Sequence, residues 1–259
     1  MRHAFFVVNS YLKKLALVIC EKALGPDHRH TAECVQHVAW EYAAQGKFDL
    51  AEPLHRRALE IREKAVGADH PDTAKCVNDL AMEYVYQGKY DLAEPLYKRS
   101  VAMREKALGT DHADTATCVN HLAMFYDYQG KYDLAEPLHQ RALAINEKAL
   151  RPDHPDTTKC LINLALLYYA QGKYDLAEPL HKRALAIREK ALGPDHPDTA
   201  GSLNNLASLY YTQGKYELAE PLYKRALAIY EKALGPDHPN TVAIRDNLQA
   251  MRADKAKAE

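Results

Sequence analysis

The chain has 259 residues, of which 47% are apolar and 27% charged, and its net charge is −1. This composition is typical of a soluble folded protein, and the balanced charge gives no field that would attract nucleic acid or an anionic membrane. No apolar run approaches the roughly 20 residues that cross a bilayer, and "AFFVV" at 4–8 is too short for the core of a signal peptide. We therefore expect a cytoplasmic protein whose partners are neither nucleic acid nor membrane.

A repeat of 42 residues organises the chain. The decapeptide "QGKYDLAEPL" or a near-copy of it begins at residues 45, 87, 129, 171 and 213. Five complete repeats fill 29–239. Residues 10–28 align with 220–238, which is the second half of a repeat, so 1–28 is predicted to be a partial N-terminal repeat that contains only a second helix.

Each repeat is predicted to be a helical hairpin. In 70–111, Pro71 suits the first position of a helix, and Gly88 suits its end. The apolar stripe of this first helix consists of Val77, Leu80, Ala81 and Tyr84. A second helix is expected over 91–108, ended by Gly109. One hairpin cannot bury both of its apolar faces, whereas stacked copies can.

The repeat resembles the tetratricopeptide repeat. The resemblance rests on Val77-x2-Leu80-Ala81-x2-Tyr84 followed by Ala93-x3-Tyr97. The 42-residue length, the linker "LGPDHPDTA" and the turn "QGKY" are similar to the repeats of kinesin light chains and their bacterial and fungal relatives. Over residues 10–250 this resemblance implies an all-α fold, an α-α superhelix built as a right-handed solenoid of antiparallel helical hairpins.

The C-terminal segment 240–259 is predicted to be a capping helix, over 240–253, and a tail. It keeps Leu248 of the first-helix pattern, but Gln249 and Arg252 replace the Ala and Tyr on which a further repeat would stack. A terminal helix with a polar outer face is what a helical array needs for solubility.

Other residue patterns in the chain have structural explanations. The Asp-His pairs recur once per repeat in the linker, which predicts a turn-and-cap role rather than a metal or acid–base site. Cysteines at one position of four successive repeats are too far apart to form disulfides or share zinc, and are expected to be buried. The Gly-Lys of "QGKY" lacks the rest of a phosphate-binding loop. We expect no cofactor, no metal and no enzymatic activity.

The first-helix surface that stacking does not require is the candidate binding site. Across the repeats it carries carboxamide, Met, aromatic and Lys side chains. Carboxamides can pair with a peptide backbone, and Met and aromatic residues form adaptable pockets. The predicted groove residues are Gln36, Trp40, Lys75, Asn78, Met82, Tyr86, Asn120, Met124, Asp127, Tyr128, Lys159, Leu166, Tyr169, Asn204 and Tyr211.

The resemblance to kinesin light chains implies a concave groove that binds short peptides. The inner asparagines of that family match Asn78, Asn120 and Asn204, whereas Gln36 and Ile162 depart from the pattern. Two functions remain open at this stage. One is a scaffold that binds a peptide segment or protein partner. The other is a structural or self-associating array, with end-to-end contact between copies, in which the asparagines only bond neighbouring helices.

Overall fold

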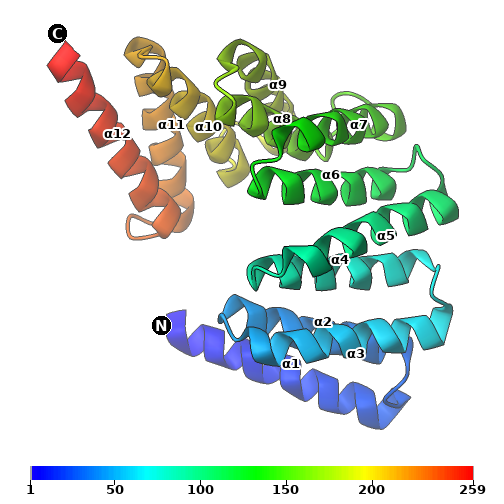
Figure 1. Cartoon of the computed structure of the whole chain (residues 1–259). Helices are drawn as coiled ribbons and strands as arrows, with labels where there is room; N and C mark the ends of the chain where they lie inside the picture. Colours follow the sequence, from blue (N-terminus) through cyan, green and yellow to red (C-terminus); the bar gives the residue numbers. More distant parts are fainter. Residues whose placement is uncertain (1, 259) are drawn as a thin grey trace. The chain divides into compact units, whose positions relative to one another are not determined.

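The computed structural model describes the backbone of residues 2–258 and the side chains from Tyr11 onward, so the side chains of the "AFFVV" segment lie outside the described residues. Over this range the structure consists of α-helices and loops, without a strand (Figure 1). The twelve helices are α1 (Arg2–Leu24), α2 (Arg29–Ala44), α3 (Phe48–Val66), α4 (Pro71–Tyr86), α5 (Tyr90–Leu108), α6 (Ala113–Tyr128), α7 (Tyr132–Leu150), α8 (Thr157–Ala170), α9 (Tyr174–Leu192), α10 (Pro197–Thr212), α11 (Tyr216–Leu234) and α12 (Pro239–Ala258).

Helix packing divides the chain into two compact units, Met1–Phe125 and Tyr126–Glu259. Within each unit a helix packs on its neighbours along the chain, so that hairpins such as α2–α3 and α10–α11 stack on the helices before and after them. We call α2, α4, α6, α8 and α10 the first helices of the repeats, and α3, α5, α7, α9 and α11 the second helices. Among the described residues, none of the helices combines the length and the apolar character needed to cross a membrane.

The turn inside each hairpin is closed by a glycine, as the sequence predicts. Gly88 takes a φ of 73° and donates its N–H to Val85 O at 3.0 Å. The next amide, Lys89 N, reaches back to Tyr84 O at 2.8 Å and closes the helix end. Only glycine adopts this conformation without a steric cost, which explains why every "QGK" turn has glycine there.

The linker between repeats is held by a histidine and a threonine. His70 caps α4, because its Nδ1 accepts the Asp72 N–H at 3.1 Å. Thr73 Oγ1 donates to the carbonyl oxygen of Gly67 at 2.8 Å, which ties the first helix to the end of the preceding second helix. The same histidine cap recurs at His28, His112, His154, His196 and His238. The predicted turn-and-cap role of the Asp-His pairs is therefore confirmed.

Small and branched side chains fill the core between first and second helices. In unit 2, Leu161, Ala184 and Ile187 form one such cluster, with Leu180 packed against it. Alanines at the helix contacts are completely buried, which lets neighbouring helices approach closely. Cys76, Cys118 and Cys160 are buried free thiols as predicted, whereas Cys34 is only half-buried.

The two ends of the chain differ in character. α1 corresponds to the second helix of a repeat and packs on α2. Its exposed apolar side chains include Tyr11, Leu12, Leu15, Val18 and Ile19. At the other end, α12 continues to Ala258, beyond the predicted limit of residue 253.

The linker after α7 departs from the repeat. Arg151 has a φ of 87° and a ψ of 150° at the position where the other linkers have a glycine. An L side chain is strained in this region. The Thr157–Arg151 hydrogen bond is 3.4 Å, whereas the matching bond from Thr199 to Gly193 is 2.9 Å.

We expect Arg151→Gly to raise the free energy of unfolding by about 1–2 kcal/mol, because it removes this strain while adding some flexibility to the unfolded chain. Urea denaturation of the full chain measures the change. The reciprocal variant Gly193→Arg should lose a similar amount. An unchanged or lower stability of Arg151→Gly would show that the linker is not strained.

Candidate functional site

In unit 1, the carboxamides of the first helices bond to the next first helix. Gln36 Nε2 donates to the Asp79 carboxylate, and Asn78 Oδ1 lies 3.0 Å from His121 Nδ1. Each bond joins residues 43 positions apart, which is one repeat plus one residue. The result is a row of polar pairs between neighbouring first helices, which we call the polar row.

The carboxamide side chains of Gln36, Asn78 and Asn120 are buried, whereas the sequence predicted that they form an exposed row. Gln36 and Asn78 are each 5% exposed and Asn120 is 8% exposed. Asn120 Nδ2 also lies 3.6 Å from Met124 Sδ. Close packing of successive first helices covers Gln36 and Asn78, whereas Asn120 is buried beside Met124 of its own helix α6.

In unit 2, several predicted groove residues also bond within the protein but stay half-exposed. Tyr169 Oη lies 2.7 Å from Thr212 Oγ1, and Asp127 Oδ2 lies 2.6 Å from the buried His139 Nε2. Tyr211 Oη donates to Asp254 Oδ2 at 2.6 Å. That hydrogen bond is the main reason that the pKa of Tyr211 is raised to about 12.

Large apolar side chains on the first helices are exposed, although packing does not require them there. Tyr86 is 55% exposed, stacked at 6.3 Å on Phe48, and Met124 is 47% exposed. Tyr128 and Leu166 in unit 2 are exposed as well. Of the remaining predicted residues, Lys75 and Lys159 are exposed, and Trp40 and Met82 are half-buried. We call the exposed first-helix side chains of each unit its first-helix face: Lys75, Tyr86 and Met124 in unit 1, and Tyr128, Lys159 and Leu166 in unit 2.

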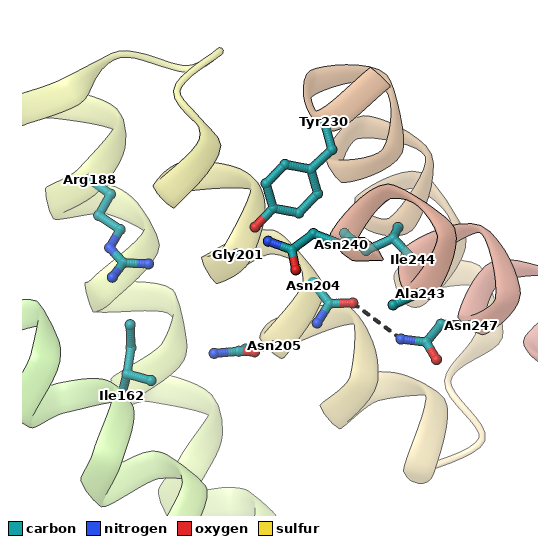
Figure 2. A pocket seen from close by; sticks show the side chains of 10 residues that line it. All are labelled: Ile162, Arg188, Gly201, Asn204, Asn205, Tyr230, Asn240, Ala243, Ile244 and Asn247. Atoms are coloured by element: carbon teal, nitrogen blue, oxygen red, sulfur yellow. Dashed lines mark hydrogen bonds between the residues drawn. The ribbon is translucent and has the colours of Figure 1, made fainter. Parts of the chain in front are cut away.

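Unit 2 also contains a pocket of about 350 Å³ that opens between α8, α10 and α12 (Figure 2). Its lining residues are Ile162, Arg188, Gly201, Asn204, Asn205, Tyr230, Asn240, Ala243, Ile244 and Asn247. Figure 2 shows Arg188 and Ile162 on one side, the α12 residues on the other, and the α10 residues between them. Asn247 Nδ2 donates to Asn204 Oδ1 at 3.4 Å across the pocket.

Only Asn204 of this lining was predicted from the sequence as a binding residue. The missed signal was Gly201, because glycine inside a helix is unusual, and the equivalent positions carry Glu33, Lys75, Thr117 and Lys159. Arg188 was missed because it belongs to a second helix. Packing turns its guanidinium toward α10, where Nη1 donates to Asp198 O at 2.7 Å and to Ser202 Oγ at 3.0 Å.

The same arrangement also affects the pKa of the Tyr230 hydroxyl. Burial and the nearby Asp198 carboxylate raise the pKa of the Tyr230 hydroxyl, and the Arg188 guanidinium offsets part of this effect. Tyr230 therefore stays a neutral hydrogen-bonding group in the pocket. Across the part of the chain that the structure describes, no group of three or more His, Cys, Asp or Glu side chains could hold a metal ion.

Comparison with solved structures finds helical-repeat proteins. BtubC (BKLC) from P. vanneervenii gives a TM-score of 0.69 at 25% identity, over 91% of this chain and 92% of that chain. A kinesin light chain-like protein of Podospora anserina, with nearly identical TPR-like repeats, gives 0.67 at 28% identity, over 80% of this chain and 97% of that chain. Aspartyl phosphate phosphatase F from Bacillus subtilis shares the fold, with a TM-score of 0.64 at 18% identity, over 92% of this chain and 65% of that chain.

Comparison with curated protein sequences gave no match. A family model for the tetratricopeptide repeat matches residues 12–64, 42–106, 84–145, 114–190, 161–232 and 198–248. These matches cover most of the chain and agree with the 42-residue unit, with the helical hairpins and with the kinesin light chain-like structures. The chain belongs to the tetratricopeptide-repeat family.

Proposed function

We propose that this protein is a non-enzymatic cytoplasmic scaffold that binds a peptide segment or protein partner along its first helices. Tetratricopeptide repeats generally mediate protein–protein interactions. The observation that carries the proposal is the exposure of Tyr86 and Met124 in unit 1, and of Tyr128 and Leu166 in unit 2. Leaving such side chains in water has no benefit for packing, whereas flexible Met and rigid aromatic groups suit the recognition of a partner's side chains.

The proposed contacts differ from the predicted set at three positions. We assign Gln36 and Asn78 to packing within the polar row and Asn120 to packing beside Met124, because all three are buried. Asn204 keeps a binding role because it lines the unit 2 pocket. The other proposed contacts are Trp40, Lys75, Met82, Tyr86, Met124, Asp127, Tyr128, Lys159, Leu166, Tyr169 and Tyr211.

A random peptide library selected on the immobilised full chain tests this function. Titration of the selected peptides should show about tenfold weaker binding to Met124→Ala, the loss expected from about 1.4 kcal/mol of contact energy. The matched control is Leu92→Ala, which removes a side chain of similar exposure (48%) from second helix α5. Absence of any selected peptide, or equal losses in both variants, would contradict the proposal.

Self-association is the second candidate, and the exposed apolar face of α1 favours it. A contiguous apolar surface of this kind is a typical protein contact site. End-to-end contact through α12 has less support, because Arg245, Gln249 and Arg252 stand where α10 has Leu203, Ala207 and Tyr210. Light scattering over a concentration series should show association that Ile19→Glu abolishes. A monomer at all concentrations would remove this candidate.

A further inference from the structure

Two cysteines lie on either side of the first linker of the chain. Cys20 is near the end of α1 and Cys34 is near the start of α2, and both are free, half-buried thiols. The two helices pack directly on each other within unit 1. Two thiols on adjoining helices, each partly open to solvent, form a candidate site of oxidation.

The later repeats show that side chains at these two positions reach each other. Cys20 and Cys34 are 14 residues apart. At the same spacing in unit 2, Asn146 Nδ2 donates to Cys160 Sγ at 3.2 Å. In the next repeat, Arg188 Nη1 donates to Ser202 Oγ at 3.0 Å. The helix ends on either side of a linker therefore bring these two positions together.

The first linker differs from the later ones in the residue at the first of these positions. The equivalents of Cys20 are Arg62, Arg104, Asn146, Arg188 and Tyr230. Each later linker therefore has at most one thiol at the two positions, whereas the first linker has two. Only the first linker can form a disulfide between them.

We propose that Cys20 and Cys34 form a reversible disulfide that fastens α1 to α2 when the protein meets a small-molecule disulfide such as glutathione disulfide. The Cys20 thiolate attacks one sulfur of glutathione disulfide, whose S–S bond breaks and releases one glutathione thiolate. Cys34 then attacks Cys20 Sγ and displaces the second glutathione thiolate. The two leaving thiolates take up the two protons that the cysteines lose. Both cysteines are oxidised, one glutathione disulfide is reduced to two glutathione molecules, and excess thiol reverses the reaction.

The order of the two attacks follows from the surroundings of Cys34. Burial, and after it the neighbouring Cys20 thiol, raise the pKa of Cys34 to about 12. A Cys34 thiolate is therefore rare at neutral pH, and the thiolate is the form that attacks a disulfide. We assign the first attack to Cys20 for this reason. The attack by Cys34 is intramolecular, and the closeness of the two residues compensates for its scarce thiolate.

The disulfide closes a short loop at the N-terminal helix of the array. α1 packs mainly on α2, whereas an internal helix such as α3 packs on the helices before and after it. A helix with fewer packed neighbours opens more readily than an internal one. Cross-linking across a loop of about 15 residues restricts the opened state. Oxidation is therefore expected to hold α1 on α2.

Peptide mapping of the full chain tests the pairing. The protein is incubated with glutathione disulfide and digested with trypsin in the absence of reductant. Cleavage after Lys and Arg releases Cys20 in peptide 15–22 and Cys34 in peptide 30–47. Mass spectrometry should find these two peptides joined. Unlinked peptides, glutathione retained on either cysteine without a link, or a disulfide between two chains would overturn the proposal.

Three variants separate the roles of the two thiols. Cys34→Ser should stop at a mixed disulfide of Cys20 with glutathione. Cys20→Ser should form the corresponding adduct at Cys34 about tenfold more slowly, and equal rates would overturn the assigned order. The control Cys118→Ser removes a buried thiol of α6 and should still form the disulfide between Cys20 and Cys34. Circular dichroism checks that each variant remains helical.

Amide hydrogen exchange measures the effect on α1. Oxidation should slow exchange in α1 by at least about tenfold in the parent and in Cys118→Ser, and should leave it unchanged in Cys20→Ser. Unchanged exchange in a parent protein that carries the disulfide would show that the bond does not fasten α1, and would overturn the proposal.

Discussion

Asp79→Asn is expected to stabilise the protein by up to about 4 kcal/mol at pH 8. Asp79 is only 6% exposed, and burial raises the pKa of its carboxyl to about 7, an effect that Lys75 and Trp40 offset only in part. The shift from an ordinary value near 3.8 is about three pH units, and each unit corresponds to about 1.4 kcal/mol. Asparagine cannot ionise, and its Oδ1 can still accept from Gln36. Chemical denaturation between pH 4 and pH 8 measures the effect.

The sign of the pH dependence follows from proton binding. Between about pH 4 and pH 7 the folded protein holds the Asp79 proton that the unfolded chain has released, so the free energy of unfolding falls as pH rises through this window. The Asp79→Asn variant should lack this fall, so that its advantage grows up to about pH 7 and then stays constant. Asp91→Asn, which removes an exposed carboxylate at the start of α5, is the control and should keep the parent's slope. Identical slopes for Asp79→Asn and the parent would contradict the prediction.

Glu83→Leu is expected to raise the free energy of unfolding by about 1–3 kcal/mol at pH 7. Glu83 is completely buried; its Oε1 accepts from Gln87 Nε2 at 2.9 Å, but its Oε2 has no hydrogen-bond partner among the described residues. The nearest basic group is His55, at 3.9 Å, but burial lowers the pKa of this histidine to about 4 and keeps it neutral. Burial also raises the pKa of Glu83. Leucine already occupies this position in the last two repeats, as Leu167 and Leu209, and urea denaturation measures the gain.

The matched control for Glu83→Leu is Glu41→Leu, which makes the same change at the same position of the first repeat. Glu41 Oε2 accepts a hydrogen bond from Lys13 Nζ at 2.7 Å, so its carboxylate has the ion-pair partner that Glu83 lacks, although Glu41 Oε1 has no hydrogen-bond partner among the described residues. Its replacement should cost about 0.5–1 kcal/mol, because Lys13 is partly exposed and loses only a partly screened partner. A loss of stability in both variants would show that Glu83 contributes to the fold through interactions other than this pair.

Much of the fold could be predicted from the sequence because the information is local and repeated. The stripe around Val77 and Leu80 has helical period, Gly88 lacks the Cβ that would be strained at its φ of 73°, and His70 lies where a cap is needed. The five copies present the same local signals, so each hairpin is predicted independently of the others. The strain at Arg151 was not predicted from the sequence, although arginine stands there where the other linkers have a glycine, and the backbone angles reveal it.

The proposed binding surface depends on contacts between repeats, which periodicity does not specify. Asn78 and Tyr86 both lie on α4 outside its core stripe, yet the neighbouring first helix covers Asn78 and leaves Tyr86 exposed. Arg188 and Gly201 are 13 residues apart, on different helices, and neither helix by itself shows that the two residues meet. The sequence alone therefore determined the repeat, the helices, their turns and the family. The tertiary structure decided which polar side chains are buried between helices and which meet in a pocket, because burial depends on the distance between stacked helices and not on position within one helix.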